Sequence, residues 1–186
     1  MSLEPSDFDL VQTALKGDVA SFEELVRRFQ TKILRFFLLH HQLEDAQDLT
    51  QETFLAAWKS LRTYNPKWQF STWILAIAHQ NNALFFRNRA HSIRPKIVDA
   101  GEDFQVDALE RPVEHTDFQT LVEAENAENF WNWIRQNIPQ EQAEILWLFY
   151  VEEKSQQEIA AITKRTVSGV KSILFRARDA LRRVLG

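Results

Sequence analysis

Residues 155–174 read SQQEIAAITKRTVSGVKSIL, and this stretch decides the fold of the C-terminal part of the chain. Ser155 can cap a short helix that ends near Ile162, because its hydroxyl can accept a hydrogen bond from a free backbone N–H of the first helical turn. Residues 163–166 then turn the chain into a second helix, which we place at 167–185 because its apolar residues recur with helical spacing. Two helices joined by so short a turn predict a helix-turn-helix.

Basic side chains gather at this end of the chain, although the whole protein has a net charge of −4. Residues 164–186 hold seven Lys and Arg residues against Asp179 alone. The early positions of the second helix are short polar or cationic groups that suit a DNA groove. Later arginines extend the positive surface toward phosphates, namely Arg176, Arg178, Arg182 and Arg183. Charge by itself is equally typical of a terminal helix whose arginines stay in water, and the helix-turn-helix spacing favours DNA binding.

Composition favours an all-α fold. Four glycines and five prolines in 186 residues leave few tight turns, and a hydrophobic content of 45% is that of a globular protein. Residues 92–116 lose apolar periodicity and collect proline, glycine and acidic side chains, which is typical of a linker. We therefore predict two small helical domains, at 8–91 and 117–186, joined by a flexible acidic linker. The second domain should open with helices at 118–136 and 140–152.

Three helices are predicted in the N-terminal domain. Apolar residues recur at three- and four-residue steps over 22–37, as on the buried stripe of a helix, and Ser21 with Glu24 has the spacing of a capping box. A second helix is expected over about 44–61, where an Asn-Pro pair follows and stops it. A third is expected over 71–87, with its first residue, a serine, as the candidate N-cap.

The second and third of these helices border two chemically different surfaces. An acidic and amide face on the helix at 44–61 can dock a basic coiled coil of a partner or simply stay in water, and periodicity does not decide between the two. Aromatic residues gather over 64–73, ahead of a helix that ends in arginines. Rings beside cations are typical of single-stranded DNA binding, since each unstacked base gains about 1–3 kcal/mol by stacking. With six tryptophans and fourteen phenylalanines, however, most of the chain's aromatic rings must be core.

The sequence gives no sign of enzymatic chemistry, of a metal or of a cofactor. The absence of cysteine removes disulfides, thiolate nucleophiles and Cys-based zinc sites, and the five histidines form no i, i+3 or i, i+4 pair. There is no phosphate-binding glycine loop and no G-x-S-x-G motif. No apolar run approaches the roughly 18 residues of a membrane span, and the acidic start is unlike a signal peptide. We therefore expect a cytoplasmic protein without membrane insertion.

Four motifs resemble, in order, those of the extracytoplasmic-function (ECF) sigma factors of bacteria. The motifs are residues 45–54 (DAQDLTQETF) with Trp58, residues 70–78 (FSTWILAIA), residues 138–150, and the set 158–160, 170–172 and 176–178. They are similar to the family's polymerase-docking helix, its promoter-melting and minus-ten-reading segment, the opening of its second DNA-binding domain, and its helix-turn-helix. The resemblance spans about residues 10–184 and implies two helical domains with a flexible linker.

The resemblance implies an alternative sigma factor, which is not an enzyme and which binds core RNA polymerase, directs it to specific promoters and helps to melt the DNA. The β′ clamp helices of the polymerase would be contacted by Asp45, Asp48, Gln51, Glu52 and Phe54. The opened minus-ten strand would be lined by Tyr64, Lys67, Trp68, Phe70, Thr72, Trp73, Gln80, Asn81, Arg87 and Arg89. The minus-thirty-five element would be read by Arg165, Ser168, Lys171, Ser172 and Arg176. The family's partners also include the β flap of the polymerase, promoter DNA and, for some members, an anti-sigma factor.

Several positions depart from the family pattern: residues 79–82 lack the denser basic run of the family, an apolar residue is usual where Arg165 stands, and Leu84 and Lys164 also differ. Asp is frequent where Leu84 stands, and Gly is usual where Lys164 stands, because a left-handed backbone conformation costs other residues free energy. The geometry of the turn and the choice of minus-ten contacts are therefore open. Two other functions are compatible with the residues alone: a stand-alone helix-turn-helix regulator whose N-terminal helices sense a ligand or dimerise, and a protein-binding adaptor without a DNA role.

Overall fold

The computed structural model describes residues 4–92 and 127–185, and the chain forms two compact units, Met1–Arg94 and Pro95–Gly186. All regular structure within the described ranges is helical, with no strand, which confirms the all-α prediction. The predicted acidic linker, apart from its first residue, and the first part of the helix predicted at 118–136 lie outside the described residues.

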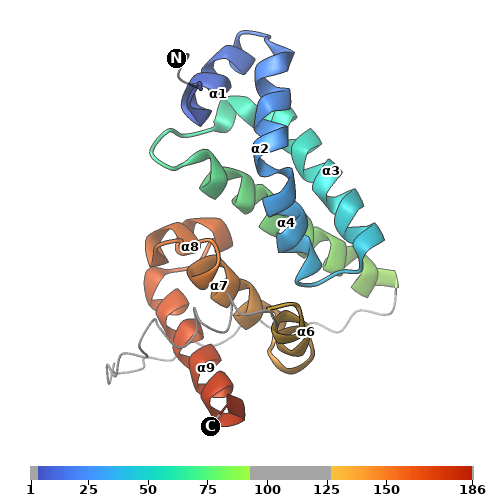
Figure 1. Cartoon of the computed structure of the whole chain (residues 1–186), viewed down its shortest axis with the longest axis vertical. Coiled ribbons are helices and arrows are strands. Elements are labelled where there is room, and N and C mark those ends of the chain that lie inside the picture. Colours follow the sequence, from blue (N-terminus) through green and yellow to red (C-terminus); the bar gives the residue numbers. More distant parts are fainter. Residues whose placement is uncertain (1–3, 93–126, 186) are drawn as a thin grey trace. The chain divides into compact units, whose positions relative to one another are not determined.

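The helices of each unit are identified in Figure 1. The first unit contains α1 (Asp7–Leu15), α2 (Val19–Leu38), α3 (Leu43–Ser60), the short 3-10 helix η1 (Leu61–Thr63) and α4 (Phe70–Ser92). The second unit contains α6 (Ala127–Asn137), α7 (Gln140–Tyr150), α8 (Gln156–Thr163) and α9 (Val167–Leu185).

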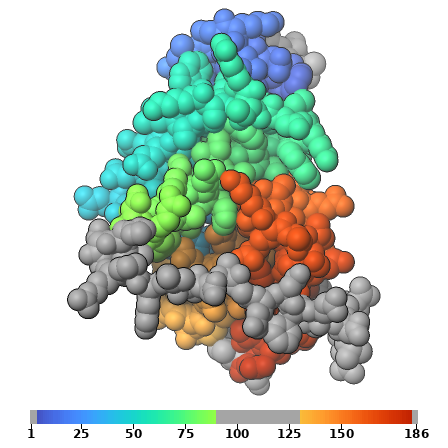
Figure 2. Space-filling view, turned by 180° about the vertical axis from the view of Figure 1, so that it is seen from behind, coloured from blue at the N-terminus to red at the C-terminus, as the bar shows by residue number. Residues whose placement is uncertain are grey.

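The central helix of the first unit is α2, which contacts α1, α3 and α4. Its apolar stripe is completely buried at Leu25, Ile33 and Phe37, because side chains three and four residues apart share one face of a helix. Ile74 and Leu75 of α4 belong to the same core. α1 lies at one end of this unit and the C-terminal part of α4 at the other (Figures 1 and 2). Both α3 and α4 keep one long face outside the core.

The first helix, α1, is not predicted by the sequence analysis. It begins with a capping box, in which Ser6 Oγ accepts a hydrogen bond from the Asp9 N–H at 3.2 Å and the Asp9 carboxylate accepts one from the Ser6 N–H at 3.3 Å. It ends at Leu15 with Lys16 as the C-cap, and the chain then turns at Gly17, whose φ of 99° is a backbone conformation that other residues rarely adopt. Leu10 and Val11 are buried on the side that contacts α2. A helix of only nine residues carries too short an apolar stripe to stand out as a pattern.

Two predicted helix starts are wrong. α2 begins before Ser21, so Ser21 and Glu24 lie within the helix and do not form a capping box; the Ser21 hydroxyl hydrogen-bonds instead to Asp18 Oδ2 at 2.5 Å. α4 begins before Ser71, whose hydroxyl donates to Gln69 Oε1 at 3.3 Å. In both places the helix begins before the serine. The serine hydroxyl therefore lies in the first helical turn and bonds to a side chain that precedes the helix.

The second unit is built on α7, which contacts α6, α8 and α9. All six residues from Ala143 to Leu148 are buried, so this helix is enclosed on nearly every side. α8 begins after the predicted cap, Ser155, whose Oγ accepts a hydrogen bond from the Glu158 N–H at 3.3 Å; the Glu158 side chain completes a capping box that was not predicted. α8 and α9 pack on each other and on α7. They form the predicted helix-turn-helix.

Candidate nucleic-acid interface

The outer face of α3 is acidic and open. The side chains of Asp48, Gln51 and Glu52 are exposed and make no hydrogen bond or ion pair with another described residue. Leu55 follows Asp48 by two helical turns on the same face and is 60% exposed. Phe54, which the resemblance assigns to the polymerase, is only 7% exposed and packs in the core, so that assignment is corrected. The helix turns its ring away from the acidic face.

A polar seam joins α3 to α4. Asn81 Nδ2 donates a hydrogen bond to Thr53 Oγ1 at 3.1 Å, and a guanidinium nitrogen of Arg89 lies 3.9 Å from Asp45 Oδ2. A hollow of about 470 Å³ lies along the seam and is lined by Leu49, Glu52, Asn81, Leu84, Phe85, Asn88 and Arg89. Asn81 and Arg89, both assigned to the minus-ten strand, therefore face α3.

The aromatic loop before α4 rests on buried residues. Phe70 and Thr72 are 1% and 2% exposed, so their assignment to direct DNA contact is corrected: they support the loop from the core side. The Phe70 ring centroid lies 6.0 Å from that of Tyr64 and 5.5 Å from that of Trp73. The Tyr64 hydroxyl donates to the Trp68 carbonyl oxygen at 2.9 Å. This bond holds the loop in a compact turn, and the Tyr64 ring packs against the rings of Phe70 and Trp73.

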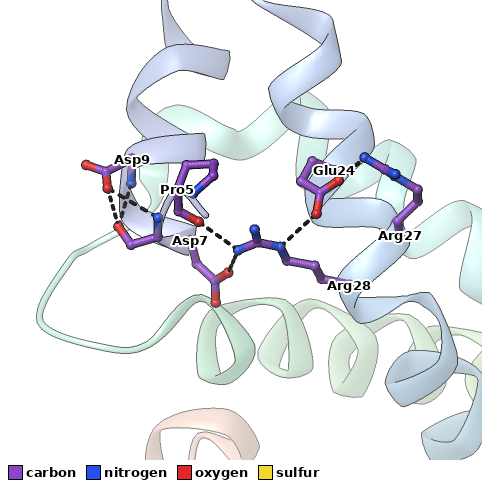
Figure 3. A network of polar contacts seen from close by, with 7 residues as sticks. Pro5, Asp7, Asp9, Glu24, Arg27 and Arg28 are labelled. Atoms are coloured by element: carbon purple, nitrogen blue, oxygen red, sulfur yellow. Dashed lines mark hydrogen bonds and ion pairs between the residues drawn. The ribbon is translucent and has the colours of Figure 1, made fainter. Parts of the chain in front are cut away.

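A network of polar and charged groups joins the start of α1 to α2 (Figure 3). The Arg28 guanidinium donates to Asp7 Oδ1 at 2.9 Å, to the Pro5 carbonyl oxygen at 3.0 Å and to Glu24 Oε1 at 2.9 Å. α1 also contacts η1, where the loop begins. Burial raises the pKa of the Tyr64 hydroxyl, and the negative charge of Asp7 raises it further. The network thus ties the start of α1 to α2 and brings a carboxylate close to the loop tyrosine.

Lys67 and Trp68 form the outer edge of the loop. Lys67 is exposed, and its Nζ lies 5.3 Å from the centroid of the partly exposed Trp68 ring. The Lys67 N–H donates to Asn65 Oδ1 at 2.9 Å, which fixes the backbone of the turn. A cation and an aromatic ring side by side at an exposed edge can hold a phosphate and an unstacked base together.

One stripe along α4 continues from this edge. Trp73, Gln80 and Arg87 stand at intervals of seven residues and so share one face of the helix. Gln80 and Arg87 are exposed, and Trp73 is partly exposed. Ala76 and Ala83 lie on the same side, and their small side chains allow another backbone to approach closely. Asn81 and Arg89 lie outside this stripe, on the side of α4 that faces α3.

The turn of the helix-turn-helix has a left-handed residue although it lacks the usual glycine. Lys164 has φ 55° and ψ 36°, and its N–H donates to the Ala160 carbonyl oxygen. The Arg165 N–H donates to the same oxygen at 3.0 Å. Thr166 Oγ1 then accepts a hydrogen bond from the Gly169 N–H at 3.1 Å, which caps the start of α9. The turn geometry left open by the sequence is therefore the left-handed one, at a conformational cost borne by Lys164.

The outer face of α9 carries four of the predicted upstream-element residues. Ser168, Lys171 and Arg176 are exposed and Ser172 is partly exposed. Phe175, which is not among the residues predicted from the sequence, lies on the same face and is 54% exposed. Its place two turns after Ser168, on the helix face opposite the apolar stripe, is a signal that could have identified it.

Two further arginines of the second unit are already engaged by neighbouring side chains. Arg165, predicted to read DNA, forms an ion pair with Glu141 of α7. Arg178 Nε donates to the Tyr150 hydroxyl at 2.8 Å, and its guanidinium lies 5.2 Å from the Phe149 ring centroid. Arg178, which the sequence analysis placed on the positive surface, therefore packs α9 against α7.

Within the described ranges, no three His, Asp or Glu side chains gather in a way that could hold a metal ion. None of the described helices has the length and apolar character needed to cross a membrane.

Sequence models of known families match both units. The model described as Sigma-70 region 2 matches residues 19–91, and the model described as Sigma-70, region 4 matches residues 136–181. The two matches occur in this order on the two helical units. Because both units match regions of a sigma factor, the alternative of a stand-alone helix-turn-helix regulator is excluded.

Curated relatives align over nearly the full length of the chain. The RNA polymerase sigma-H factor of Pseudomonas aeruginosa is 29% identical over 188 residues, which cover 100% of this chain and 96% of that protein. The ECF RNA polymerase sigma-E factor of Haemophilus influenzae is 26% identical, over 97% of this chain and 96% of that protein. The corresponding factor of Escherichia coli K12 is 27% identical, with coverages of 97% and 95%.

Two solved structures share the fold. One is of CnrH in complex with the cytosolic domain of CnrY, with a TM-score of 0.66, 20% identity and coverage of 97% of both chains. The other is of the sigma factor RpoE in complex with the anti-sigma factor NepR from Bartonella quintana, with a TM-score of 0.66, 19% identity and coverage of 88% of this chain and 96% of that one. These two structures share the fold of this chain. The two region models and the full-length relatives show that the chain belongs to the ECF sigma factors of the sigma-70 family.

Proposed function

We propose that this alternative sigma factor docks on core RNA polymerase through α3, reads the upstream promoter element with α9, and holds the opened minus-ten strand on the loop before α4. The observation that carries the proposal is the match of sigma regions 2 and 4 to two separate helical units. Each of these units presents an exposed face of suitable chemistry. The domain limits proposed are 8–91 and 117–186, with 92–116 as linker.

The docking surface proposed on α3 consists of Asp48, Gln51 and Glu52 with Leu55 beside them. These acidic and amide groups have no partner among the described residues, so they can meet the cations of a clamp helix without first breaking an internal bond. Asp45 contributes at the edge, where Arg89 already neutralises part of its charge. Phe54 is left out because it is buried.

The single-strand surface proposed on the first unit combines the loop edge with the α4 stripe. Lys67 and Trp68 would meet the strand at the loop, and Trp73, Gln80 and Arg87 would follow it along α4. Stacking of an unpaired base on an exposed ring contributes about 1–3 kcal/mol, which offsets much of the cost of unstacking. Tyr64 holds the loop shape through its bond to the Trp68 carbonyl oxygen. We assign Asn81 and Arg89 to the α3 seam.

The duplex surface proposed on the second unit is the outer face of α9. Ser168, Lys171, Ser172 and Arg176 supply hydrogen bonds and positive charge, and the exposed Phe175 ring can contact a thymine methyl group in the major groove. Arg165 belongs to this surface only after it leaves Glu141.

The partners proposed are core RNA polymerase, through its β′ clamp helices and β flap, and promoter DNA. A third is an anti-sigma factor, since both similar solved structures are complexes and NepR, the partner in one of them, is an anti-sigma factor. Initiation by this route needs only binding and strand capture, so we propose no catalytic residue, metal or cofactor. The site of action would be the cytoplasm, where the polymerase works.

Reconstituted transcription tests this function directly. Core polymerase is incubated with a library of promoters randomised in both elements, with and without the full chain, and the transcripts are sequenced. The proposal predicts a set of transcripts that share two motifs and are made only when the chain is present. Transcripts that are identical with and without the chain would contradict it.

A further inference from the structure

The ion pair between Arg165 and Glu141 links the turn of the helix-turn-helix to the first turn of α7. The Arg165 side chain is 45% exposed and that of Glu141 is 46% exposed, so both charged groups can be reached from outside the protein. Arg165 also directly precedes the capping residue of α9. The pair therefore lies at the border of the proposed duplex surface.

Other cations on this surface are in a different situation. Lys171 and Arg176 are exposed and form no ion pair with another residue in the described part of the chain. They can bind a phosphate directly. Arg165 must first leave a carboxylate, because the carboxylate and a phosphate compete for the same guanidinium N–H groups.

The exposure of the Arg165 and Glu141 side chains sets how strongly Glu141 competes with DNA. An exposed ion pair is weak, since water and salt screen its charges. Breaking it lowers DNA affinity by a small factor.

We propose that Glu141 is an affinity-determining residue of the upstream-element interface, because it competes with promoter DNA for Arg165. The inference rests on the proposed function of the α9 face. The contribution of Arg165 is therefore conditional. Arg165 joins the interface only where its contact with DNA is more stable than its ion pair with Glu141.

Holoenzyme assembled from core polymerase and the full chain provides the test. Its dissociation constant is measured by fluorescence anisotropy, over a range of salt concentrations, for a duplex that carries the upstream motif selected in the library experiment. Glu141→Gln should bind this duplex about two- to fivefold more tightly than the wild type. Its salt dependence should be steeper by about 0.9 in log–log slope, which corresponds to one added phosphate contact. Glu153→Gln is the matched control, since Glu153 is exposed in the same unit and forms no ion pair among the described residues.

A double-mutant cycle separates release of Arg165 from simple loss of a negative charge. In an Arg165→Gln background, Glu141→Gln should change the affinity no more than Glu153→Gln does. The inference is overturned by an equal gain in both backgrounds. It is also overturned by weaker binding of Glu141→Gln, which would mean that Glu141 orients Arg165 for DNA. If Lys171→Ala weakens binding while Glu141→Gln has no effect, the inference fails and the proposed function stands. If no upstream motif is selected at all, the proposed function itself fails.

Discussion

Arg178 Nε donates a hydrogen bond to the hydroxyl of Tyr150 at 2.8 Å, and this bond joins the recognition helix α9 to the buried helix α7. The same guanidinium lies 5.2 Å from the Phe149 ring centroid and 5.5 Å from that of Tyr150. A positive charge in a DNA-reading helix is here used to fix the helix in place. Basic composition alone therefore overstates the number of phosphate contacts that α9 can make.

Arg178→Gln should destabilise the protein by about 1–2 kcal/mol, because it removes a charge-assisted hydrogen bond and a partly buried cation–π contact. The salt dependence of duplex binding should change little. Urea unfolding followed by circular dichroism measures the first effect, and anisotropy titrations measure the second. Arg182→Gln, at an exposed position of the same helix, is the control for loss of charge. Equal stability of the two variants would contradict this role for Arg178.

Lys164→Gly should stabilise the second unit by about 0.5–1 kcal/mol. Lys164 adopts a left-handed conformation with φ 55°, and glycine removes that steric cost while adding some conformational entropy to the unfolded chain. The midpoint of chemical unfolding measures the change. A lower midpoint than that of the wild type would show that the lysine side chain itself holds the turn.

Tyr64 should make folding sensitive to alkaline pH. Its pKa is raised by burial and by Asp7, so the folded state prefers the neutral phenol. The resulting stabilisation is complete below the ordinary tyrosine pKa and is lost as the pH rises through the pKa of Tyr64. Asp7→Asn should lower that pKa toward its ordinary value. NMR titration of ring-labelled tyrosine measures it, with Tyr64→Phe used to assign the signal, and an unchanged titration in Asp7→Asn would rule out the charge effect.

Lys171→Ala and Phe175→Ala should weaken upstream-element binding in different ways. Loss of the lysine should reduce affinity for all sequences alike and lower the salt slope by about 1. Loss of the phenylalanine should leave the salt slope unchanged and relax the preference at one base pair by about 1–3 kcal/mol. Anisotropy titrations with single-base variants of the selected duplex distinguish the two. A salt slope that falls in Phe175→Ala would contradict its assignment to base contact.

Much of the fold follows from periodic patterns in the sequence. The apolar stripe of α2 and the N-cap at Ser155 are both present in the structure, because they depend on local sequence within one helix. α1 was missed because its stripe is short. For Phe54, the helical spacing and the family resemblance lead to different predictions. The spacing places Phe54 on the apolar side of α3, whereas the resemblance assigns it to the polymerase. Phe54 is buried, in agreement with the spacing.

The candidate sites could be predicted only in part, because tertiary contacts decide which polar groups are available. Arg89 faces Asp45, Asn81 donates to Thr53, and Arg165 pairs with a glutamate of another helix, and none of these contacts has a signal in local sequence. Phe175 differs from these residues, because its position opposite the apolar stripe of α9 could be recognised from helical spacing.

Docking of α3 on the polymerase is the central claim, and the affinity of the chain for core polymerase tests it most directly. The double variant Asp48→Arg with Glu52→Arg reverses two exposed charges on one face of α3. A matched control reverses Glu4 and Glu23, two exposed acids of the same unit away from that face. We expect the α3 variant to bind core polymerase at least about tenfold more weakly than the wild type, and the control to bind within about twofold of it. Wild-type affinity in the α3 variant, or an equal loss in both, would contradict the account.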